Sequence, residues 1–316
     1  MTIVDKFTST GAKFFNHLDR LQHLKNGNVY PIVAHIMPTS LCNLNCSYCS
    51  IKSRPKEELD FDEIKKTTIE LLSHGLRAVI LSGGGEPLIY KHFDELVEFL
   101  HHYKLEIGLI TNGTLLKHHD VSKFTWVRVS INPETINNLD LPEIPGTLGF
   151  SYIVSGETEE MLTESIKKII KLVDKYNPEY VRVLSDCAIS NEDILQNQIL
   201  IKKVVDKFPD YKDVFFQQYK LPSSPDKCYL GYLHPVIYCD GYVYPCDSLV
   251  LNDHKVQKFK DKYRICSMKD LTPLLDTHII KSLVNPKRDC PNCVFRKQNQ
   301  LLDSILNPPE VHKNFI

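Results

Sequence analysis

The sequence predicts an α/β protein whose core is a parallel sheet, because short apolar strands alternate with amphipathic helices along its first two thirds. In such chains each strand-helix-strand unit is right-handed, so successive strands run in the same direction. After Phe216 the alternation stops, which predicts a smaller C-terminal unit of another kind. Six strands are expected, at residues 32–36, 78–81, 107–111, 126–131, 149–154 and 180–184.

The helices are expected where apolar residues recur every three or four positions. Asp60 is placed to cap a helix, and Glu63 follows three residues later, as in a capping box. Gly75 then ends that helix. Other helices are expected near residues 11–27, 93–103, 159–176 and 194–208. The apolar faces of the first and third of these are predicted to consist of Phe14, Leu18, Leu21 and Leu24, and of Met161, Leu162, Ile166, Ile169 and Val173.

Composition excludes several classes of protein. With 316 residues, 42% hydrophobic and 24% charged, the chain is long enough for a full globular core. A net charge of −1 argues against a dedicated nucleic-acid surface, and no apolar stretch is long enough to cross a membrane. The N-terminus shows no export signal, so ten cysteines indicate metal or redox chemistry in the reducing cytoplasm rather than disulfides.

The stretch from residue 31 to residue 50 carries the first chemical signal. An apolar strand ends at Pro38, and Cys42, Cys46 and Cys49 follow in a short polar loop with C-x3-C-x2-C spacing. Three thiolates at one centre suit an iron–sulfur cluster, zinc or copper, and three on a four-iron cubane leave one iron open for a chelating ligand. A zinc site would need a fourth ligand nearby, and the nearest candidate, His35, would point off the preceding strand.

A glycine run supplies the second signal. Residues 78–87 read AVILSGGGEP, an apolar strand that ends in glycines and is followed by Glu86 and Pro87. Glycines let a ligand approach the backbone closely, and a carboxylate just beyond them can accept hydrogen bonds from an ammonium group.

Together the two motifs resemble those of the radical S-adenosylmethionine (SAM) superfamily, in which C-x3-C-x-aromatic-C holds a [4Fe–4S] cluster and GGEP binds the methionine end of SAM. The resemblance implies an open six-unit (β/α) barrel with functional residues where strands end. It also implies that a set of residues contacts the cluster or SAM. This set is Cys42, Cys46 and Cys49 as cluster ligands, with Tyr48, Gly84, Gly85 and Glu86 as cofactor-binding residues.

Two further strand ends fit this scheme. Thr111 closes the third strand, and Ser130 and Asn132 close the fourth. Each could equally be a turn whose side chain bonds its own backbone. By resemblance to relatives with auxiliary clusters, Ser130 and Asn132 are expected to contact SAM and Thr111 to face the substrate.

The C-terminal region contains a second group of cysteines. A hairpin is expected at 236–244 around Asp240-Gly241. Cys228, Gly241 and Cys246 have the spacing of the opening of the SPASM domain, an auxiliary-cluster extension of radical SAM enzymes. Because no cysteine follows Cys293, the pattern resembles the shortened twitch version, as in 2-deoxy-scyllo-inosamine dehydrogenase. The implied ligands of one auxiliary [4Fe–4S] cluster are Cys228, Cys246, Cys290 and Cys293.

Alternatives stay open for this region. C-x2-C on a turn also suits a zinc ribbon. Cys239 could replace Cys246 as a ligand, although it stands just before the expected turn. Cys187, Cys239 and Cys266 are expected to be buried or spare thiols. The expected units are an N-terminal helical extension (1–30), a core barrel (31–212) and an auxiliary-cluster domain (213–316).

The first functional hypothesis is that the chain cleaves SAM to a 5′-deoxyadenosyl radical, removes a substrate hydrogen and oxidises a small molecule with the auxiliary cluster as electron acceptor. The second is a redox-neutral epimerase or peptide (RiPP) maturase, in which Cys187 returns a hydrogen atom. The third is a zinc-binding protein without catalysis. A flavodoxin or ferredoxin is the expected electron donor, and the sequence does not identify the substrate.

Overall fold

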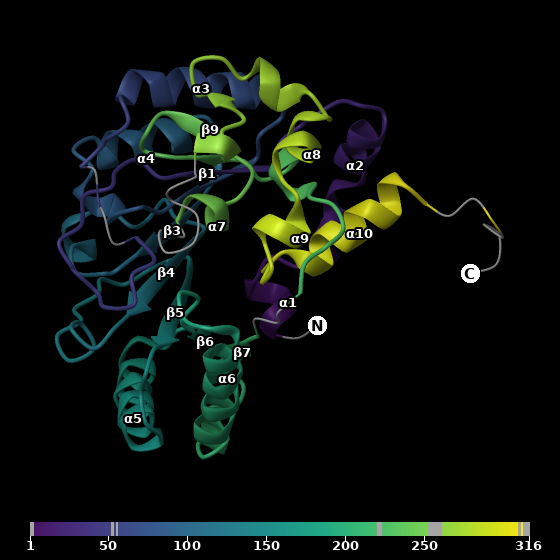
Figure 1. Ribbon diagram of the computed structural model, residues 1–316. Helices are drawn as coiled ribbons and strands as arrows, with labels where there is room; N and C mark the ends of the chain where they lie inside the picture. Colours follow the sequence, from purple (N-terminus) through teal and green to yellow (C-terminus); the bar gives the residue numbers. More distant parts are fainter. Residues whose placement is uncertain are drawn as a thin grey trace.

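In the computed structural model, a mostly parallel sheet runs through the chain and helices cover it (Figure 1). The structure describes residues 3–51, 54, 56–219, 223–251, 261–308 and 311. Among these residues the strand order is β10-β9-β8-β1-β2-β3-β4-β5-β6-β7. The strands are β1 (Val33–Ile36), β2 (Ala78–Leu81), β3 (Glu106–Thr111), β4 (Trp126–Ile131), β5 (Thr147–Val154), β6 (Tyr180–Ser185), β7 (Phe215–Gln218), β8 (Val236–Ile237), β9 (Tyr242–Tyr244) and β10 (Cys266–Ser267).

The helices lie mainly between successive parallel strands. The α-helices are α1 (Ile3–Phe7), α2 (Leu18–Lys25), α3 (Phe61–Ser73), α4 (Phe93–His102), α5 (Glu159–Tyr176), α6 (Asn191–Val205), α7 (Asp247–Val250), α8 (Ile279–Leu283), α9 (Pro286–Asp289) and α10 (Arg296–Leu306). The 3-10 helices are η1 (Gly11–His17), η2 (Pro87–Ile89), η3 (Leu116–His118), η4 (Pro209–Tyr211), η5 (Leu230–Tyr232) and η7 (Thr272–Leu275). None of the described helices is long and apolar enough to cross a membrane.

The six predicted strands are confirmed as β1 to β6, and all of them pair in parallel. Two further strands join them in parallel, β7 beside β6 and β8 beside β1. Both come from the segment assigned above to the auxiliary domain, so the sheet continues across residue 212. Within the described residues the sheet does not close, because β7 and β10 are its edges.

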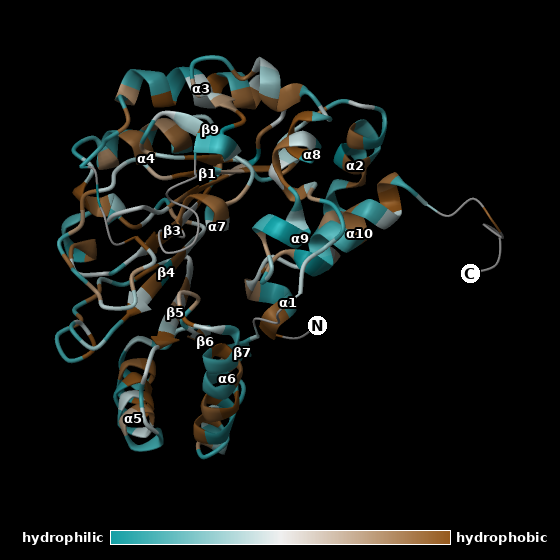
Figure 2. Ribbon diagram, in the orientation of Figure 1, coloured by the Kyte–Doolittle hydropathy of each residue, from teal (hydrophilic) through white to brown (hydrophobic). Residues whose placement is uncertain are grey.

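The two faces of the sheet differ in chemistry. One is covered by the crossover helices, and residues such as Val127, Val129 and Val181 are completely buried there. Figure 2 shows the apolar stripes and polar outer surfaces of α5 and α6 on this side. The opposite face, here called the inner face, carries polar side chains at matching register positions. The inner face is defined by His35, Arg128, Ser130, Ser151 and Arg182.

Local signals explain where the helices begin. The side chain of Asp60 accepts a hydrogen bond from the backbone N–H of Glu63, as the capping box predicts. Thr158 caps α5 in the same way, and α5 has the predicted bounds. Ser190 caps α6, which therefore starts three residues before the expected Ile194.

Two predictions about the helix faces were wrong. Met161 is 56% exposed, because Leu162, one residue later, takes the core-facing side of the first turn of α5. Leu18 is 58% exposed. Residues Gly11–His17 form a 3-10 helix, whose turn of three residues rotates the apolar face relative to an α-helix, so Leu18 turns toward solvent.

The C-terminal segment extends the sheet beside β1 and packs against the N-terminal helices. The predicted hairpin is confirmed as β8 and β9, with Gly241 at a φ of 80° in the turn. Helix α10 lies beside η1 and α2, where the side chain of Gln298 donates a hydrogen bond to the carbonyl of Ser9 (Figure 1). The N-terminal helices are thus held by the last helix of the chain.

Candidate active site

The cysteine loop follows β1 and is closed at its base by backbone hydrogen bonds. The backbone N–H of Ser40 donates to the carbonyl of Glu57 (2.9 Å), and that of Leu59 donates to the carbonyl of Pro38 (2.8 Å). Inside the loop the N–H of Cys49 donates to the carbonyl of Cys46 (3.1 Å). The three predicted thiols are half-buried and near enough to interact electrostatically.

Asn43 docks this loop onto the end of β3. Its amide nitrogen donates to the hydroxyl of Thr114 (2.8 Å), and its amide oxygen accepts from the side chain of Asn112 (2.8 Å). Sequence reasoning missed Asn43. The only available signal was an amide side chain inside a cysteine loop, which has no recognisable partner until the strands are assembled.

Side chains surround the thiols of the loop. The hydroxyl of Tyr48 is hydrogen-bonded to Cys46 and to the side chain of Asn132, so the structure brings these three predicted residues together. Burial raises the pKa of the Cys46 thiol. The guanidinium of Arg54 donates to the sulfur of Cys49 (3.3 Å) and to the carbonyl of Leu44 (2.8 Å). Arg54 was also missed by sequence reasoning.

The glycine run lies against the residues that precede the cysteines. The N–H of Gly85 donates to the carbonyl of Thr39 (3.1 Å), and that of Glu86 donates to the carbonyl of Leu41 (2.7 Å). A Cβ atom at Gly85 would overlap the carbonyl oxygen of Leu41, so only glycine permits this approach. A Cβ atom at Gly84 would meet the hydroxyl of Tyr238, just after β8 (2.8 Å).

Glu86 is 2% exposed, and its carboxylate links the glycine run to the end of β3. It accepts hydrogen bonds from the hydroxyl of Thr111 (2.6 Å) and from the backbone N–H groups of Asn112 (2.7 Å) and Leu88 (3.2 Å). A carboxylate has about four lone-pair sites, so room for about one more donor remains. Burial raises the pKa of Glu86. Thr111 also accepts from the N–H of Gly113 (3.0 Å), and its substrate role stays a prediction.

Ser130 and Asn132 end β4 in different environments. Ser130 is half-buried on the inner face beside Ser151 of β5. Asn132 is buried and accepts hydrogen bonds from the backbone N–H (3.0 Å) and the hydroxyl (3.1 Å) of Thr135. The turn expected after β4 is therefore present, and Tyr48 uses the remaining side of Asn132.

The four predicted auxiliary ligands also come together. Cys246 interacts electrostatically with Cys290 and Cys293, and Cys228 interacts with Cys293. Burial raises the pKa of Cys228 to about 12 and raises the pKa of the other three thiols as well. Cys239 is 3% exposed in the hydrophobic core.

Backbone N–H groups point at three of these four sulfurs, those of Cys228, Cys246 and Cys293. Each sulfur accepts from a residue two positions later in the chain, where a helix or helical turn begins. The donors are Leu230 and Gly231 for Cys228, Ser248 for Cys246, and Phe295 for Cys293. N–H groups at a helix start stabilise negative charge, so these donors offset part of the effect of burial on the pKa of the thiols.

These donor sets fit iron–sulfur clusters better than a single ion. A zinc site gathers four ligands around one metal, whereas each cysteine of a cubane binds a different iron. In the described part of the chain, no group of three or more His, Cys, Asp and Glu side chains is placed to hold one ion. The thiolate-only sets and the donors around them would hold clusters at Cys42, Cys46 and Cys49 and at the four C-terminal cysteines.

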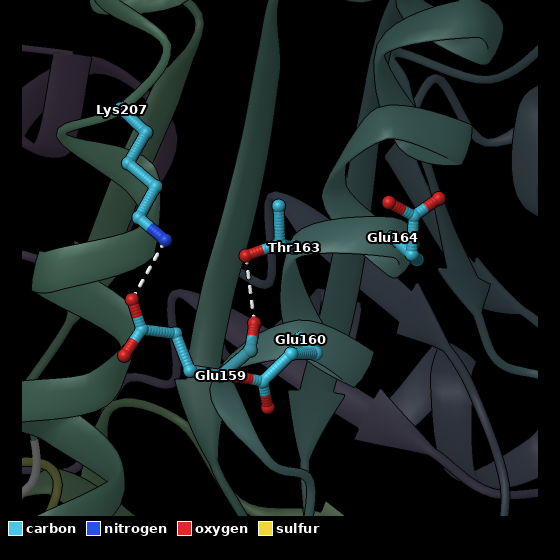
Figure 3. A pocket seen from close by; sticks show the side chains of 5 residues that line it. All are labelled: Glu159, Glu160, Thr163, Glu164 and Lys207. Carbon is cyan, nitrogen blue, oxygen red and sulfur yellow. Dashed lines mark hydrogen bonds and ion pairs between the residues drawn. The ribbon is translucent and has the colours of Figure 1, made fainter.

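The remaining thiols and one surface cavity belong to neither cysteine group. Cys187 follows β6 and is half-exposed, while Cys266 is buried. Figure 3 shows a surface cavity near the start of α5, where Lys207 forms an ion pair with Glu159 (2.7 Å). Thr163 donates there to the carbonyl of Glu159 (2.6 Å). An exposed ion pair of this kind carries little energy, and no predicted site residue lines the cavity.

Comparisons with known proteins agree with this geometry. A family profile described as the radical SAM superfamily matches residues 36–178. A probable GTP 3′,8-cyclase of Methanococcus vannielii is 34% identical over 114 residues, which cover 34% of this chain and 38% of that protein. The sporulation killing factor maturation protein SkfB of Bacillus subtilis is 26% identical over 264 residues, which cover 72% of this chain and 64% of SkfB. The matching segments span less than two thirds of either relative.

Solved structures share the fold. Native anSMEcpe with bound AdoMet superposes with a TM-score of 0.58 at 19% identity, covering 85% of this chain and 88% of that chain. Streptococcus suis SuiB bound to precursor peptide SuiA gives a TM-score of 0.54 at 14% identity, covering 80% of this chain and 69% of that chain. At these identities the likeness shows the fold alone.

Proposed function

This chain carries the domain of the radical SAM superfamily, and from this premise we propose that it is an enzyme that oxidises a small molecule at a C–H bond beside a hydroxyl or amine. Bound to a [4Fe–4S] cluster, SAM supplies a 5′-deoxyadenosyl radical, which is the hydrogen-abstracting species. Cys42, Cys46 and Cys49 would hold that cluster. Tyr48, Glu86 and the other predicted cofactor-binding residues would orient SAM over it.

The observation that carries the oxidation is the second cysteine group. Four cysteine ligands leave no open iron for substrate, so a cluster there supplies an electron acceptor rather than a binding site. Cys246 is followed by Asp247, whose carboxylate interacts electrostatically with His35 and Arg182 of the inner face. The proposed acceptor would therefore lie next to the face on which a substrate would bind.

The experiment is anaerobic reconstitution with iron and sulfide, followed by incubation with SAM and a reductant. The proposal requires about eight iron atoms per chain, as two [4Fe–4S] clusters contain, and formation of 5′-deoxyadenosine. With a substrate, one 5′-deoxyadenosine should form per oxidised product. Flavodoxin or ferredoxin is the proposed electron donor, and the ten free cysteines support a reducing, cytoplasmic location. A zinc content without iron, and no SAM cleavage, would instead favour the zinc-binding hypothesis.

A redox-neutral peptide maturase is the second candidate, favoured by the similarity to SkfB over 72% of this chain. In that reaction a hydrogen atom must return to the substrate, and Cys187 after β6 would supply it. The variant Cys187→Ala separates the candidates. A maturase or epimerase of this kind would lose turnover, whereas a dehydrogenase would retain it and would still form one 5′-deoxyadenosine per product.

A further inference from the structure

Neither of two arginines of the inner face, Arg128 and Arg182, forms an ion pair with a carboxylate of the described residues. Arg182 of β6 donates to the hydroxyl of Ser151 from Nε (3.2 Å) and Nη2 (2.9 Å), and from Nη1 to the side-chain oxygen of Gln218 (2.9 Å). Both acceptors are neutral. A guanidinium has five N–H donors, so two of those on Arg182 remain.

Arg128 of β4 has fewer hydrogen-bond partners than Arg182 among the described residues. Its guanidinium lies 5.9 Å from the ring centre of Trp126, and its Nε is buried without a hydrogen-bond acceptor among the described residues. Arg128 precedes Ser130 by two residues on β4. Ser130 pairs with Ser151 of β5, and Ser151 pairs with Arg182 of β6. The two arginines and the two serine hydroxyls therefore occupy adjacent positions on three neighbouring strands.

The charges of this region do not balance. No carboxylate among the described residues lies within ion-pair distance of Arg128 or Arg182. Burial lowers the pKa of Arg182 to about 9, and the charge of Arg128 lowers it further. Burial also lowers the pKa of His35 and His234, so both are neutral near pH 7. Asp247 is the carboxylate that interacts with Arg182, and it does so at longer range. A half-buried cation without an adjacent carboxylate is costly, which favours a ligand that brings the opposite charge.

We propose that Arg182 and Arg128, with the hydroxyl of Ser151, bind an oxyanion group of the substrate, a phosphate or a carboxylate, beside Ser130, which is assigned to SAM. This inference rests on the proposed function and names the substrate class of that reaction: a small molecule with an anionic group. The planar fork of arginine matches the geometry of both groups, and paired charged hydrogen bonds fix the orientation of the ligand. Anchoring by the anion would hold a chosen C–H bond at a fixed place on the inner face.

The test measures anion binding by the full, cluster-loaded chain. Inorganic phosphate and acetate are titrated calorimetrically at constant ionic strength into the unaltered chain, Arg182→Gln, Arg182→Lys and Arg128→Gln. Binding of phosphate or acetate by the unaltered chain is expected, and it identifies which oxyanion is preferred. Loss of a charged hydrogen bond should weaken binding roughly tenfold or more in either glutamine variant. Arg182→Lys keeps the positive charge, so its affinity for the anion should lie between that of the unaltered chain and that of Arg182→Gln. Arg77→Gln removes an arginine half-exposed at the surface and should bind as the unaltered chain does.

The same titrations can overturn the proposal. It fails if the unaltered chain binds neither anion, or if Arg182→Gln and Arg128→Gln bind as tightly as Arg77→Gln, with iron content confirming that each variant is folded. It also fails if Arg182→Gln weakens SAM binding in equilibrium dialysis as much as it weakens anion binding, because the arginine would then serve the SAM carboxylate. SAM cleavage by the unaltered chain tests the proposed function separately, since it requires no substrate anion.

Discussion

The two cysteine groups are built in different ways, although both consist of half-buried thiols. Around Cys46 and Cys49 the hydrogen-bond donors are side chains, those of Tyr48 and Arg54, on a loop that is tied down at its ends. Around the C-terminal cysteines most donors are backbone N–H groups at the starts of helical turns, and the side chain of Asn299 is a further donor to Cys293. Cys228, Cys246 and Cys290 also pack against the hydrophobic core.

This difference separates two tasks. A backbone pocket inside a packed core is formed by folding itself, so it suits a cluster that only exchanges electrons. A loop held by side-chain hydrogen bonds can change its contacts when a ligand binds, which a cluster with an open iron and a bound SAM molecule requires. The fold would therefore determine the geometry of the second cluster, while the first depends on a few individual side chains that can be changed one at a time.

The largest expected effect comes from Cys46→Ala. Loss of one of three ligands should abolish SAM cleavage and lower the iron content from about eight to about four, because one [4Fe–4S] cluster holds four irons. The C-terminal cluster should persist, since its pocket does not involve the loop. Iron analysis and chromatography of 5′-deoxyadenosine measure both quantities. Cys187→Ala is the matched control and should retain all the iron. Retained SAM cleavage in Cys46→Ala would contradict the assignment of this cluster.

Cys246→Ala tests the group of C-terminal cysteines. It should remove the second cluster and stop substrate oxidation while reductive cleavage of SAM continues. In the metal-free chain it should also lower the free energy of unfolding by about 1–2 kcal/mol, because a thiol packed against the core is replaced by a cavity. Cys46→Ala, in a loop outside the hydrophobic core, should change the free energy of unfolding by less than about 0.5 kcal/mol. Equal destabilisation of the two variants in urea unfolding would show that the two environments do not differ as described.

Gly85→Ala tests whether the cysteine loop that contains Cys42, Cys46 and Cys49 depends on its contact with the glycine run. The added methyl group would overlap the carbonyl of Leu41 and push the cysteine loop away from Glu86. SAM binding should weaken by roughly tenfold or more, as expected when a charged hydrogen bond of about 1.5–3 kcal/mol is lost. Gly156→Ala is the control, because Gly156 has a positive φ (75°) and open space around it. It should destabilise the fold by about 1–2 kcal/mol without weakening SAM binding. Equal loss of SAM binding in both variants would mean that folding, not the contact, is responsible.

The sequence predicted the elements whose signals are local. The cap at Asp60, the bounds of α5 and the turn at Gly241 follow from neighbouring residues, and the alternation of strands and helices led correctly to a parallel sheet. The positions of β7 and β8 at the two sides of the sheet could not be predicted. Both are short, and their places depend on partners far away in the chain.

The same division applies to the candidate site. The cysteines and the glycine run are contiguous motifs, so their spacing carried the prediction. Asn43 was missed because its partners Asn112 and Thr114 are brought near it only in the folded chain. Arg54 was missed because its hydrogen bonds to Cys49 and Leu44 depend on how the loop folds back on itself. Arg128 and Arg182 lie 54 positions apart in the sequence numbering, and only the register of β4, β5 and β6 places them on one face.

Arg54→Gln is expected to have the smallest effect and is the most specific test of the side-chain environment. The guanidinium donates to the sulfur of Cys49, and such a hydrogen bond stabilises the reduced, more negative cluster. Its loss, about 1 kcal/mol, should lower the midpoint potential of the first cluster by roughly 40 mV for one electron. Redox titration followed by electron paramagnetic resonance measures this potential with iron content unchanged. The second cluster should keep its potential, because the donors to its cysteines are other groups: backbone N–H groups and the side chain of Asn299. Equal shifts in both clusters, or none in the first, would mean that side-chain donors do not tune the open cluster separately from the closed one.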